Sequence, residues 1–427
     1  MKKLLLIFIT FSFRWLTIAL CVGGSLFTCL QVQAQGLWTP RASLPDSARG
    51  EGISFTIGNY GYVGLGENFS YYPFQFYKDF WRFDPANDSW TRMADFPGKT
   101  RVLPATFVIG HYGYVVCGDS AGQGSTLYNE CWRYDAYTDT WTQKANFGGA
   151  ARAYACGFAI GAKGYVGLGV GMGFYKDFWA YDTATNTWTQ ITDFGIAGRI
   201  CTSAFAIGGK GYVCFGQDSS YANDLKNEMW VYDTATNSWA QKTSNPGQPF
   251  FGTCGFVIGT NIYVGTGQDD GATDYSTFWK YNTMTDTWIK QANFTYATFG
   301  GFAFAIGDTG YMGLGWDTIP PEYNSNTWYK FYPDTLTALN EIPFTKNNII
   351  IYPNPFKTQC HISLPADKVN SVPEFNLYTI TGRKMNVTIT KLYNTYLMKI
   401  EDLPSGIYIL SIQCKSQIFN KKVIIIH

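Results

Sequence analysis

The stretch Trp179-Ala-Tyr-Asp-Thr-Ala-Thr-Asn-Thr-Trp188 holds two tryptophans nine residues apart, and its pattern decides the fold. The frame is Trp, an aromatic residue two positions later, Asp or Asn, a Thr/Asn-rich turn and a second Trp. It recurs roughly every fifty residues, as expected when one supersecondary unit is copied along a chain. The other pairs are Trp81/Trp90, Trp132/Trp141, Trp230/Trp239 and Trp279/Trp288. The sequence therefore predicts a repeat protein.

Each repeat contains four short stretches that are typical of β-strands. The first ends in Phe-x-Ile-Gly, as in Phe158–Gly161, and its glycine suits a tight turn with positive φ. The second opens with Gly-Tyr-Val at Gly164. The third carries the first tryptophan with the aromatic residue that shares its face, and the fourth carries the second tryptophan. We therefore predict a four-stranded antiparallel unit.

Six first strands and six second strands occur, but the sixth unit lacks its second tryptophan. We assign Trp328 as the third-strand tryptophan of that unit, and no tryptophan follows it. Trp38 lies 52 residues before Trp90, which equals the repeat period. We therefore expect the N-terminal strand to complete the last unit and close a six-bladed β-propeller with no long free edge.

The repeat resembles the kelch repeat, whose propellers include the central domain of galactose oxidase. The resemblance rests on the Tyr and Trp separated by six residues, such as Tyr181 and Trp188, and on the apolar run before glycine. It covers roughly residues 35–338 and implies an all-β, kelch-type propeller. Most units carry one glycine where kelch repeats have two, as in Leu65-Gly66, which leaves the sub-family open.

Histidine is too scarce for several kinds of catalysis. A copper oxidase needs imidazole ligands, but the chain has only His111, His361 and His427, and two of these lie in the tail. The same shortage argues against a hydrolytic triad. We expect no metal and no cofactor. Basic residues are scattered over a chain of net charge +1, so we expect no nucleic-acid partner.

The two ends of the chain carry export features. Lys2, Lys3, an apolar run and Val32-Gln-Ala34 predict a signal peptide over 1–34, with no membrane span after its cleavage; an uncleaved anchor is the alternative. After a linker at 339–344, residues 345–427 alternate apolar residues with Gly and Pro. This pattern predicts a small β-sandwich of six or seven strands.

The tail resembles the C-terminal sorting domain of type IX secretion cargo. The resemblance rests on three motifs in order, formed by Tyr352, Pro353, Asn354 and Pro355, by Gly382 and Arg383, and by the Leu-Pro-Ser-Gly-Ile-Tyr stretch around Gly406. It implies that the type IX machinery is a partner and that the protein is secreted or displayed on the outer cell surface.

Four arginines, each nine residues before the turn glycine of a first strand, form the main candidate site: Arg49, Arg101, Arg152 and Arg199. Strand alternation places them at one end of the innermost strands, on the face with the variable loops. A cationic ring there could bind a carboxylate or an acidic sugar. Alternatively, each arginine fixes its own loop. Further ligand-binding candidates are Glu51, Tyr71, Tyr221, Tyr275 and Trp316.

Three functions remain open from the sequence. The first is a binding module for a glycan or a protein, with no catalytic residue assigned. The second is an enzyme of the mutarotase or epimerase type that acts on an acidic sugar, with Glu51 as the first carboxylate to test. The third is a structural surface protein. No catalytic domain accompanies the repeats, which favours the binding module.

Overall fold

The computed structural model is all-β in its described residues, and the chain divides into two compact units, Gln33–Leu336 and Thr337–His427. The predicted signal peptide lies outside the described residues. These residues are 36–68, 74–120, 126–195, 197–218, 224–316, 325–333, 349–352, 357–364, 373–379, 383–392, 395–400, 403–404, 406–414 and 417–425.

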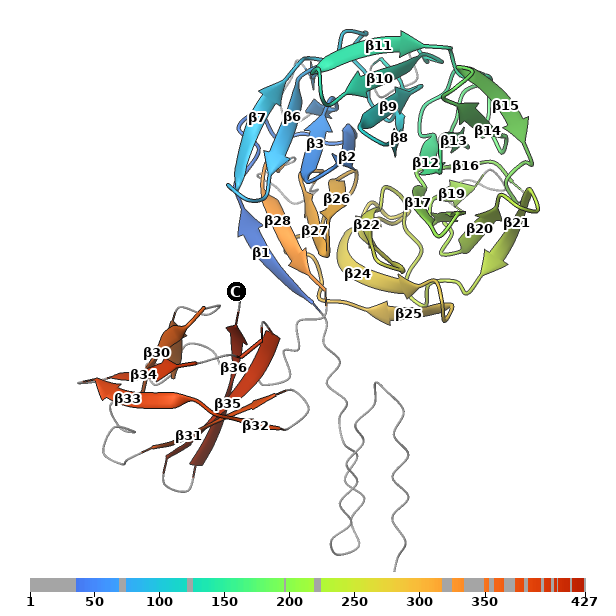
Figure 1. Ribbon diagram of the computed structural model, residues 1–427. Helices are drawn as coiled ribbons and strands as arrows, with labels where there is room; N and C mark the ends of the chain where they lie inside the picture. The colour runs from blue at the N-terminus through green and yellow to red at the C-terminus, as the bar shows by residue number, and fades with distance from the viewer. Residues whose placement is uncertain are drawn as a thin grey trace, which may run out of the picture. The chain divides into compact units, whose positions relative to one another are not determined.

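The described part of the first unit contains six four-stranded antiparallel sheets around a common centre (Figure 1). With strands given from the centre outward, the first two sheets are β2 (Ile53–Ile57), β3 (Tyr60–Gly64), β6 (Phe80–Asp84) and β7 (Ser89–Met93), and then β8 (Ala105–Ile109), β9 (Tyr112–Val116), β10 (Cys131–Asp135) and β11 (Thr140–Lys144). The third and fourth sheets are β12 (Cys156–Ile160), β13 (Lys163–Gly167), β14 (Phe178–Asp182) and β15 (Thr187–Ile191), and then β17 (Ser203–Ile207), β18 (Lys210–Cys214), β20 (Met229–Asp233) and β21 (Ser238–Lys242). The fifth and sixth sheets are β22 (Cys254–Ile258), β23 (Asn261–Gln268), β24 (Asp274–Asn282) and β25 (Thr287–Lys290), and then β26 (Phe302–Ile306), β27 (Thr309–Gly313), β28 (Trp328–Tyr332) and β1 (Leu37–Arg41). Two short pairs, β4 (Glu67–Asn68) with β5 (Gln75–Phe76) and β16 (Arg199–Ile200) with β19 (Gln217–Asp218), flank them.

The N-terminal strand β1 pairs with β28, the third strand of the sixth sheet from the centre, as the spacing of Trp38 predicts. Trp38 lies opposite Phe331, and its indole Nε1 donates to the Ala292 carbonyl over 3.2 Å. Trp90 makes the same kind of bond to Ala42 over 2.9 Å. Trp38 therefore takes the place of the missing second tryptophan, using a residue from the other end of the repeat region.

Trp328 does not occupy the position that the sequence assigns to it. It pairs with Gly313, as Phe80 pairs with Gly64, so it matches the residue before the repeating tryptophan. Tyr329 stands at the tryptophan position instead. Successive side chains in a strand point to opposite faces, so a shift of one residue turns Trp328 toward the other face, where it is 1% exposed. The assignment of Trp328 is therefore wrong by one position.

Neighbouring sheets pack through phenylalanine against glycine. A Cβ on Gly61 would clash with the ring of Phe304, and one on Gly113 would clash with Phe55. In five of the six sheets the second strand has this glycine, because the ring of the preceding sheet lies against its backbone, whereas the fifth sheet has Ile262 at the equivalent position. The same contact joins Phe107 to Gly164, Phe158 to Gly211 and Phe256 to Gly310.

The second unit consists, where described, of two four-stranded sheets with one core between them. One sheet contains β29 (Ile350–Tyr352), β30 (Gln359–Ser363), β34 (Thr395–Lys399) and β33 (Thr388–Leu392). The other contains β32 (Lys384–Met385), β31 (Glu374–Thr379), β35 (Gly406–Cys414) and β36 (Gln417–Ile425). Cys360 and Met398 from the first sheet share a core with Leu377 and Leu410 from the second. The sandwich has eight described strands, against the six or seven predicted, because Lys384–Met385 forms a separate short strand.

We expect Trp38→Ala to destabilise the first unit by about 3–5 kcal/mol, the usual cost of truncating a buried tryptophan. Trp38 makes edge-to-face contacts with Phe278 at 5.1 Å and Phe294 at 4.8 Å, as well as its hydrogen bond. Urea unfolding followed by tryptophan fluorescence measures the change. Leu37→Ala, at a neighbouring residue that is 46% exposed, is the control. Equal midpoints for the two variants would contradict a stabilising role for β1.

Candidate functional site

Six equivalent residues, one before each innermost strand, form a ring in the left-handed backbone conformation. Their φ values lie between 53° and 64°, and they are Glu51, Leu103, Tyr154, Cys201, Gly252 and Gly300. Backbone hydrogen bonds link the ring: Leu103 N–H donates to the Glu51 carbonyl over 2.8 Å, and Glu51 N–H donates to the Gly300 carbonyl over 3.0 Å. Three further bonds of this kind lie between Tyr154 and Leu103, Gly252 and Cys201, and Gly300 and Gly252.

A cavity of about 410 Å³ is lined by all six residues of this ring. Glu51, Leu103, Tyr154 and Cys201 are only partly buried and present their side chains there. Aromatic residues that follow the arginine position in units five and six add an apolar wall. The rings of Phe251 and Phe299 pack edge-to-face at 6.1 Å, and Trp316 stacks on Phe299 at the same spacing.

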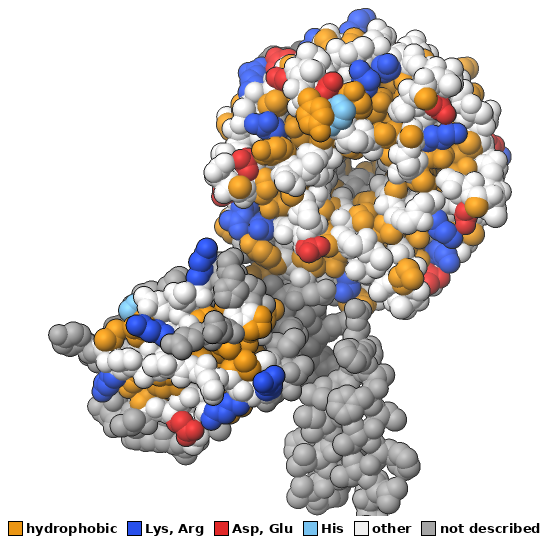
Figure 2. Space-filling model, viewed as in Figure 1, with side chains coloured by type: hydrophobic (Ala, Val, Ile, Leu, Met, Phe, Trp, Pro, Cys, Tyr) orange, Lys and Arg blue, Asp and Glu red, His pale blue; other side chains and the backbone are white. Residues whose placement is uncertain are grey.

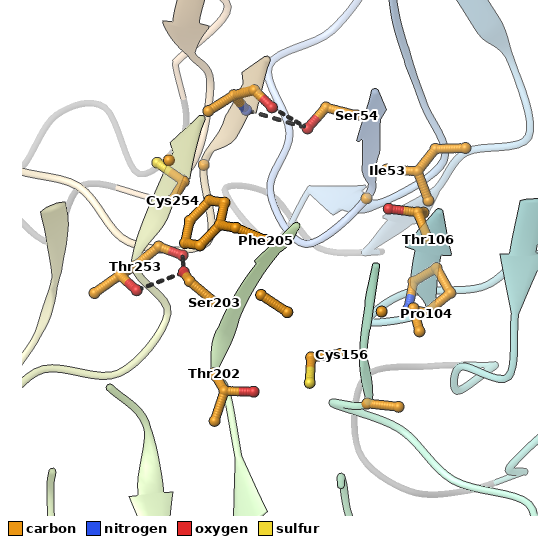
Figure 3. A pocket seen from close by; sticks show the side chains of 18 residues that line it. Ile53, Ser54, Pro104, Thr106, Cys156, Thr202, Ser203, Phe205, Thr253 and Cys254 are labelled. Atoms are coloured by element: carbon orange, nitrogen blue, oxygen red, sulfur yellow. Dashed lines mark hydrogen bonds between the residues drawn. The ribbon is translucent and has the colours of Figure 1, made fainter. Parts of the chain in front are cut away.

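A narrower space of about 230 Å³ continues from this cavity between the innermost strands (Figure 3). Small polar side chains line it, and no charged residue is among its described lining. Ser203 Oγ lies 2.7 Å from Thr253 Oγ1, and Ser54 Oγ donates to the Ala303 carbonyl over 3.0 Å. These hydroxyls bond to neighbouring strands, so this space is a hydrogen-bonded part of the scaffold.

The four predicted arginines do not line the cavity. Each is at least 96% buried and forms an ion pair with a carboxylate two residues before a repeating tryptophan. Arg152 donates to both carboxylate oxygens of Asp177 over 2.7 and 2.9 Å, and also to the Leu168 carbonyl. The other pairs are Arg49–Asp79, Arg101–Glu130 and Arg199–Glu228. The structure thus gives no cationic ring at the cavity wall.

The repeating tryptophan donates to the same carboxylate, so a buried arginine, a carboxylate and a tryptophan form one hydrogen-bonded group. Trp179 Nε1 bonds to Asp177 over 2.7 Å. Burial alone would raise the pKa of Asp177, but the hydrogen bonds from Arg152 and Trp179 hold it below its usual value. Unit five has Phe250 and Thr277 at the arginine and carboxylate positions. The arginine and the carboxylate are therefore absent from the same repeat. This correlation between the repeats could have revealed the arginine–carboxylate ion pair from the sequence.

Glu51 is the one predicted candidate of clear chemical interest at the cavity. Next to it lies Glu67, which is 0% exposed and has no hydrogen-bond donor in good geometry to either carboxyl oxygen within the described ranges. Burial raises the pKa of Glu51 to about 7, although a contact between the Glu51 and Glu67 carboxyls lowers it, and burial, the Glu51 charge and the same contact raise the pKa of Glu67 to about 10. The charge of Asp119 raises both further. The two carboxyl groups therefore keep at least one proton at neutral pH.

The other candidates are only partly placed. Trp316 lies beside the ring, and its indole would clash with a Cβ on Gly50. The Tyr275 hydroxyl donates to Asp269 over 2.8 Å, and its ring packs 4.8 Å from Phe250, so it is not among the residues that line the cavity. Tyr71 and Tyr221 lie outside the described residues.

Sequence analysis missed Tyr154, Cys201, Phe251 and Phe299. Each lies one or two residues after an arginine position or its equivalent in units five and six. A signal for the ring does exist: the backbone repeats at this position, but the residues are Glu, Leu, Tyr, Cys, Gly and Gly. A position that varies inside an otherwise regular repeat is where a binding surface is expected.

The sorting motif is placed in part. Tyr352 ends β29, Gly406 begins β35, and the Arg383 backbone N–H donates to Thr379 Oγ1 over 3.1 Å beside the β31–β32 connection. Pro353, Asn354, Pro355 and Gly382 lie outside the described residues.

Comparison with known proteins supports both units. The family model of the secretion system C-terminal sorting domain matches residues 350–426. The tail is thus a type IX sorting domain, and the protein is secreted or displayed at the cell surface. No curated protein matches the chain. The solved structure of YjhT aligns with 67% of this chain and 95% of its own at 15% identity and a TM-score of 0.56, which shows a propeller-like fold alone.

Two further observations concern the described residues alone. Within those ranges, no group of three or more His, Cys, Asp and Glu side chains is arranged to hold a metal ion. No helix there has the length and apolar character needed to cross a membrane. The space-filling view in Figure 2 shows one face of the first unit, with basic and acidic side chains interspersed around a central hollow.

We expect Arg152→Ala to destabilise the protein by about 3–5 kcal/mol, because Asp177 would be left as an uncompensated charge in the interior. The double variant Arg152→Phe/Asp177→Thr copies the residues of unit five and should recover most of this loss. Chemical unfolding of both variants and of Asp177→Thr gives the comparison. If Arg152→Ala unfolds like the wild type, the arginine is not structural.

The Glu67 carboxyl should make stability depend on pH. Its pKa is raised from 4.5 to about 10, so between these values the folded chain holds a proton that the unfolded chain releases. The free energy of unfolding therefore falls as pH rises through this window. We expect Glu67→Gln to be more stable than wild type at about pH 8.5, with the advantage shrinking toward pH 5. Thermal melts measure this, and Asp95→Asn, at an exposed carboxylate, is the control. An advantage that does not change with pH would contradict the shift.

Proposed function

We propose that the protein is an exported binding module whose first unit, residues 35–338, is a closed, six-bladed, kelch-type propeller that binds a glycan in the ring-lined cavity. The β1–β28 pair supports closure, and so does the hydrogen bond from Glu51 to Gly300, which joins the first and last sheets. In this proposal residues 1–34 are a signal peptide, 339–344 a linker and 345–427 the sorting domain.

One observation carries the binding role: equivalent backbone positions converge on one cavity but carry different side chains. A left-handed conformation costs roughly 1–2 kcal/mol for a residue with a Cβ. Four of the six ring residues nevertheless have side chains, and these face the cavity. Left-handed residues with side chains also occur at buried positions such as Leu65 and Leu168, so the conformation belongs to the repeat, and it is the variation of the side chains at the cavity that supports the binding role.

The lining favours a sugar over a flat protein surface. A volume of about 410 Å³ is within the range of small-molecule sites. Phe251 and Phe299 offer ring faces and edges for the apolar side of a sugar, while Glu51, Thr202 and Gln217 offer hydrogen bonds. Since the four arginines are paired elsewhere, the lining does not favour an acidic sugar.

An enzyme of the mutarotase or epimerase type is the second candidate, and Glu51 is the observation that favours it. A carboxyl with a pKa of about 7 can donate and accept a proton near neutral pH. Faster interconversion of sugar anomers, followed by NMR and lost in Glu51→Gln, would support this activity.

We expect Phe299→Ala and Phe251→Ala to weaken glycan binding at least about fivefold, from loss of ring contacts worth about 1 kcal/mol. A glycan screen on the exported protein, followed by calorimetry with the best ligand, provides the measurement. Phe299→Leu should lose less, and Tyr137→Ala, at a tyrosine that is 82% exposed and not part of the lining, should bind like the wild type. Unchanged binding in both alanine variants would remove the cavity as the site.

A further inference from the structure

Among the described residues that line the cavity beside Glu51, none is a lysine or an arginine. Glu51 lies on the cavity wall, and a β-bridge between Gly50 and Glu67 fixes Glu67 beside it. A matching bridge between Val102 and Asp119 brings the carboxylate of the next unit close enough to act on both. These three acids form an acidic group, and the other titratable groups that face it are Tyr154 and Cys201.

The arginines nearest to the acidic group in the sequence already form ion pairs with other carboxylates. Arg49 pairs with Asp79 over 2.6 Å and lies 3.9 Å from the ring centre of Tyr77. Arg101 pairs with Glu130. Within the described lining no cation balances ionised Glu51 and Glu67, and the pair retains a proton instead.

The remaining cavity wall suits an organic cation. The faces of Phe and Tyr rings attract ammonium groups, most strongly where water is excluded. Tyr154, Phe251 and Phe299 line the cavity together with Glu51, and the Trp316 indole stacks against Phe299. One carboxylate with several aromatic rings is a pattern that binds an ammonium group by charge and by ring contact at once.

From this arrangement we infer that the cavity prefers a ligand with an organic ammonium group, such as an amino sugar with a free amine, bound by the Glu51 carboxylate and the aromatic wall. This inference rests on the proposed glycan-binding function and specifies its ligand. On binding, the ammonium charge replaces the proton that the Glu51–Glu67 pair retains. That proton passes to solvent, up to one for each ligand bound.

Calorimetry of the exported protein with four matched sugars tests the inference: glucosamine, glucose, N-acetylglucosamine and glucuronate. At about pH 7 we expect glucosamine to bind at least tenfold more tightly than the other three. Titration in buffers with different ionisation enthalpies should show proton release with glucosamine alone. Lowering the pH to about 5.5 should weaken glucosamine binding, because protons then compete for the carboxyl pair.

Variants and a non-sugar probe separate the possible failures. Glu51→Gln keeps the shape of the side chain and should abolish the preference for glucosamine while glucose binding persists. Asp95→Asn makes the same change at an exposed carboxylate and should have no effect. Benzylamine and benzyl alcohol form a second charged and neutral pair without a sugar ring.

Each outcome is decisive. Equal binding of all four sugars, tighter binding of glucuronate, or a preference that survives in Glu51→Gln overturns the ammonium inference and leaves the glycan-binding cavity standing. Binding of benzylamine but not benzyl alcohol, with no sugar bound, overturns the glycan function and supports the ammonium site. Binding of neither glucosamine nor benzylamine overturns the inference.

Discussion

The backbone hydrogen bonds around the centre of the first unit are the constraint on which the candidate site depends. Each bond runs from the N–H of one left-handed residue to the carbonyl of its counterpart in a neighbouring sheet, as from Leu103 to Glu51. Because the main chain makes these links, the side chains at the ring positions are not needed to hold neighbouring sheets together there. The repeat can therefore hold the backbone constant while the chemistry at the cavity varies.

The four arginines do not line the cavity, because each of them is paired with a carboxylate away from its wall. Each arginine lies within a few residues of the ring, yet its charge is used by a carboxylate and a tryptophan in the interior, as in Arg152–Asp177–Trp179. Unit five does without this group, with Phe250 and Thr277 in its place, which agrees with the general finding that apolar residues can replace a buried ion pair. A buried arginine that appears in four repeats thus fixes loops and does not present its guanidinium to the cavity.

The architecture could be predicted from the sequence to a large extent because its determinants are local and repeated. The Trp–Trp spacing indicates the third and fourth strands, and the position of Trp38 indicates the β1–β28 pair, since equivalent positions need only be counted. Trp328 shows where this counting fails. The sixth unit has no partner tryptophan nine residues later, so its alignment with the other repeats could be wrong by one residue. The role of Arg152 was harder to predict, because it depends on Asp177, which lies 25 residues later in the sequence, beyond β12 and β13.

Glu67 occupies an electrostatically unfavourable position in the interior. The arginine-paired carboxylates are stabilised by hydrogen bonds that lower their pKa values, whereas Glu67 is buried without a donor in good geometry among the described residues and lies next to two further acids. A glutamine or an apolar residue would remove the like-charge repulsion at this position, so folding alone does not account for a carboxyl there. Its position directly behind Glu51 does account for it, because a second acid makes the proton on the cavity wall responsive to any positive charge that enters. The scaffold therefore carries an electrostatic cost beside the cavity, where a ligand of the proposed cationic class would offset it.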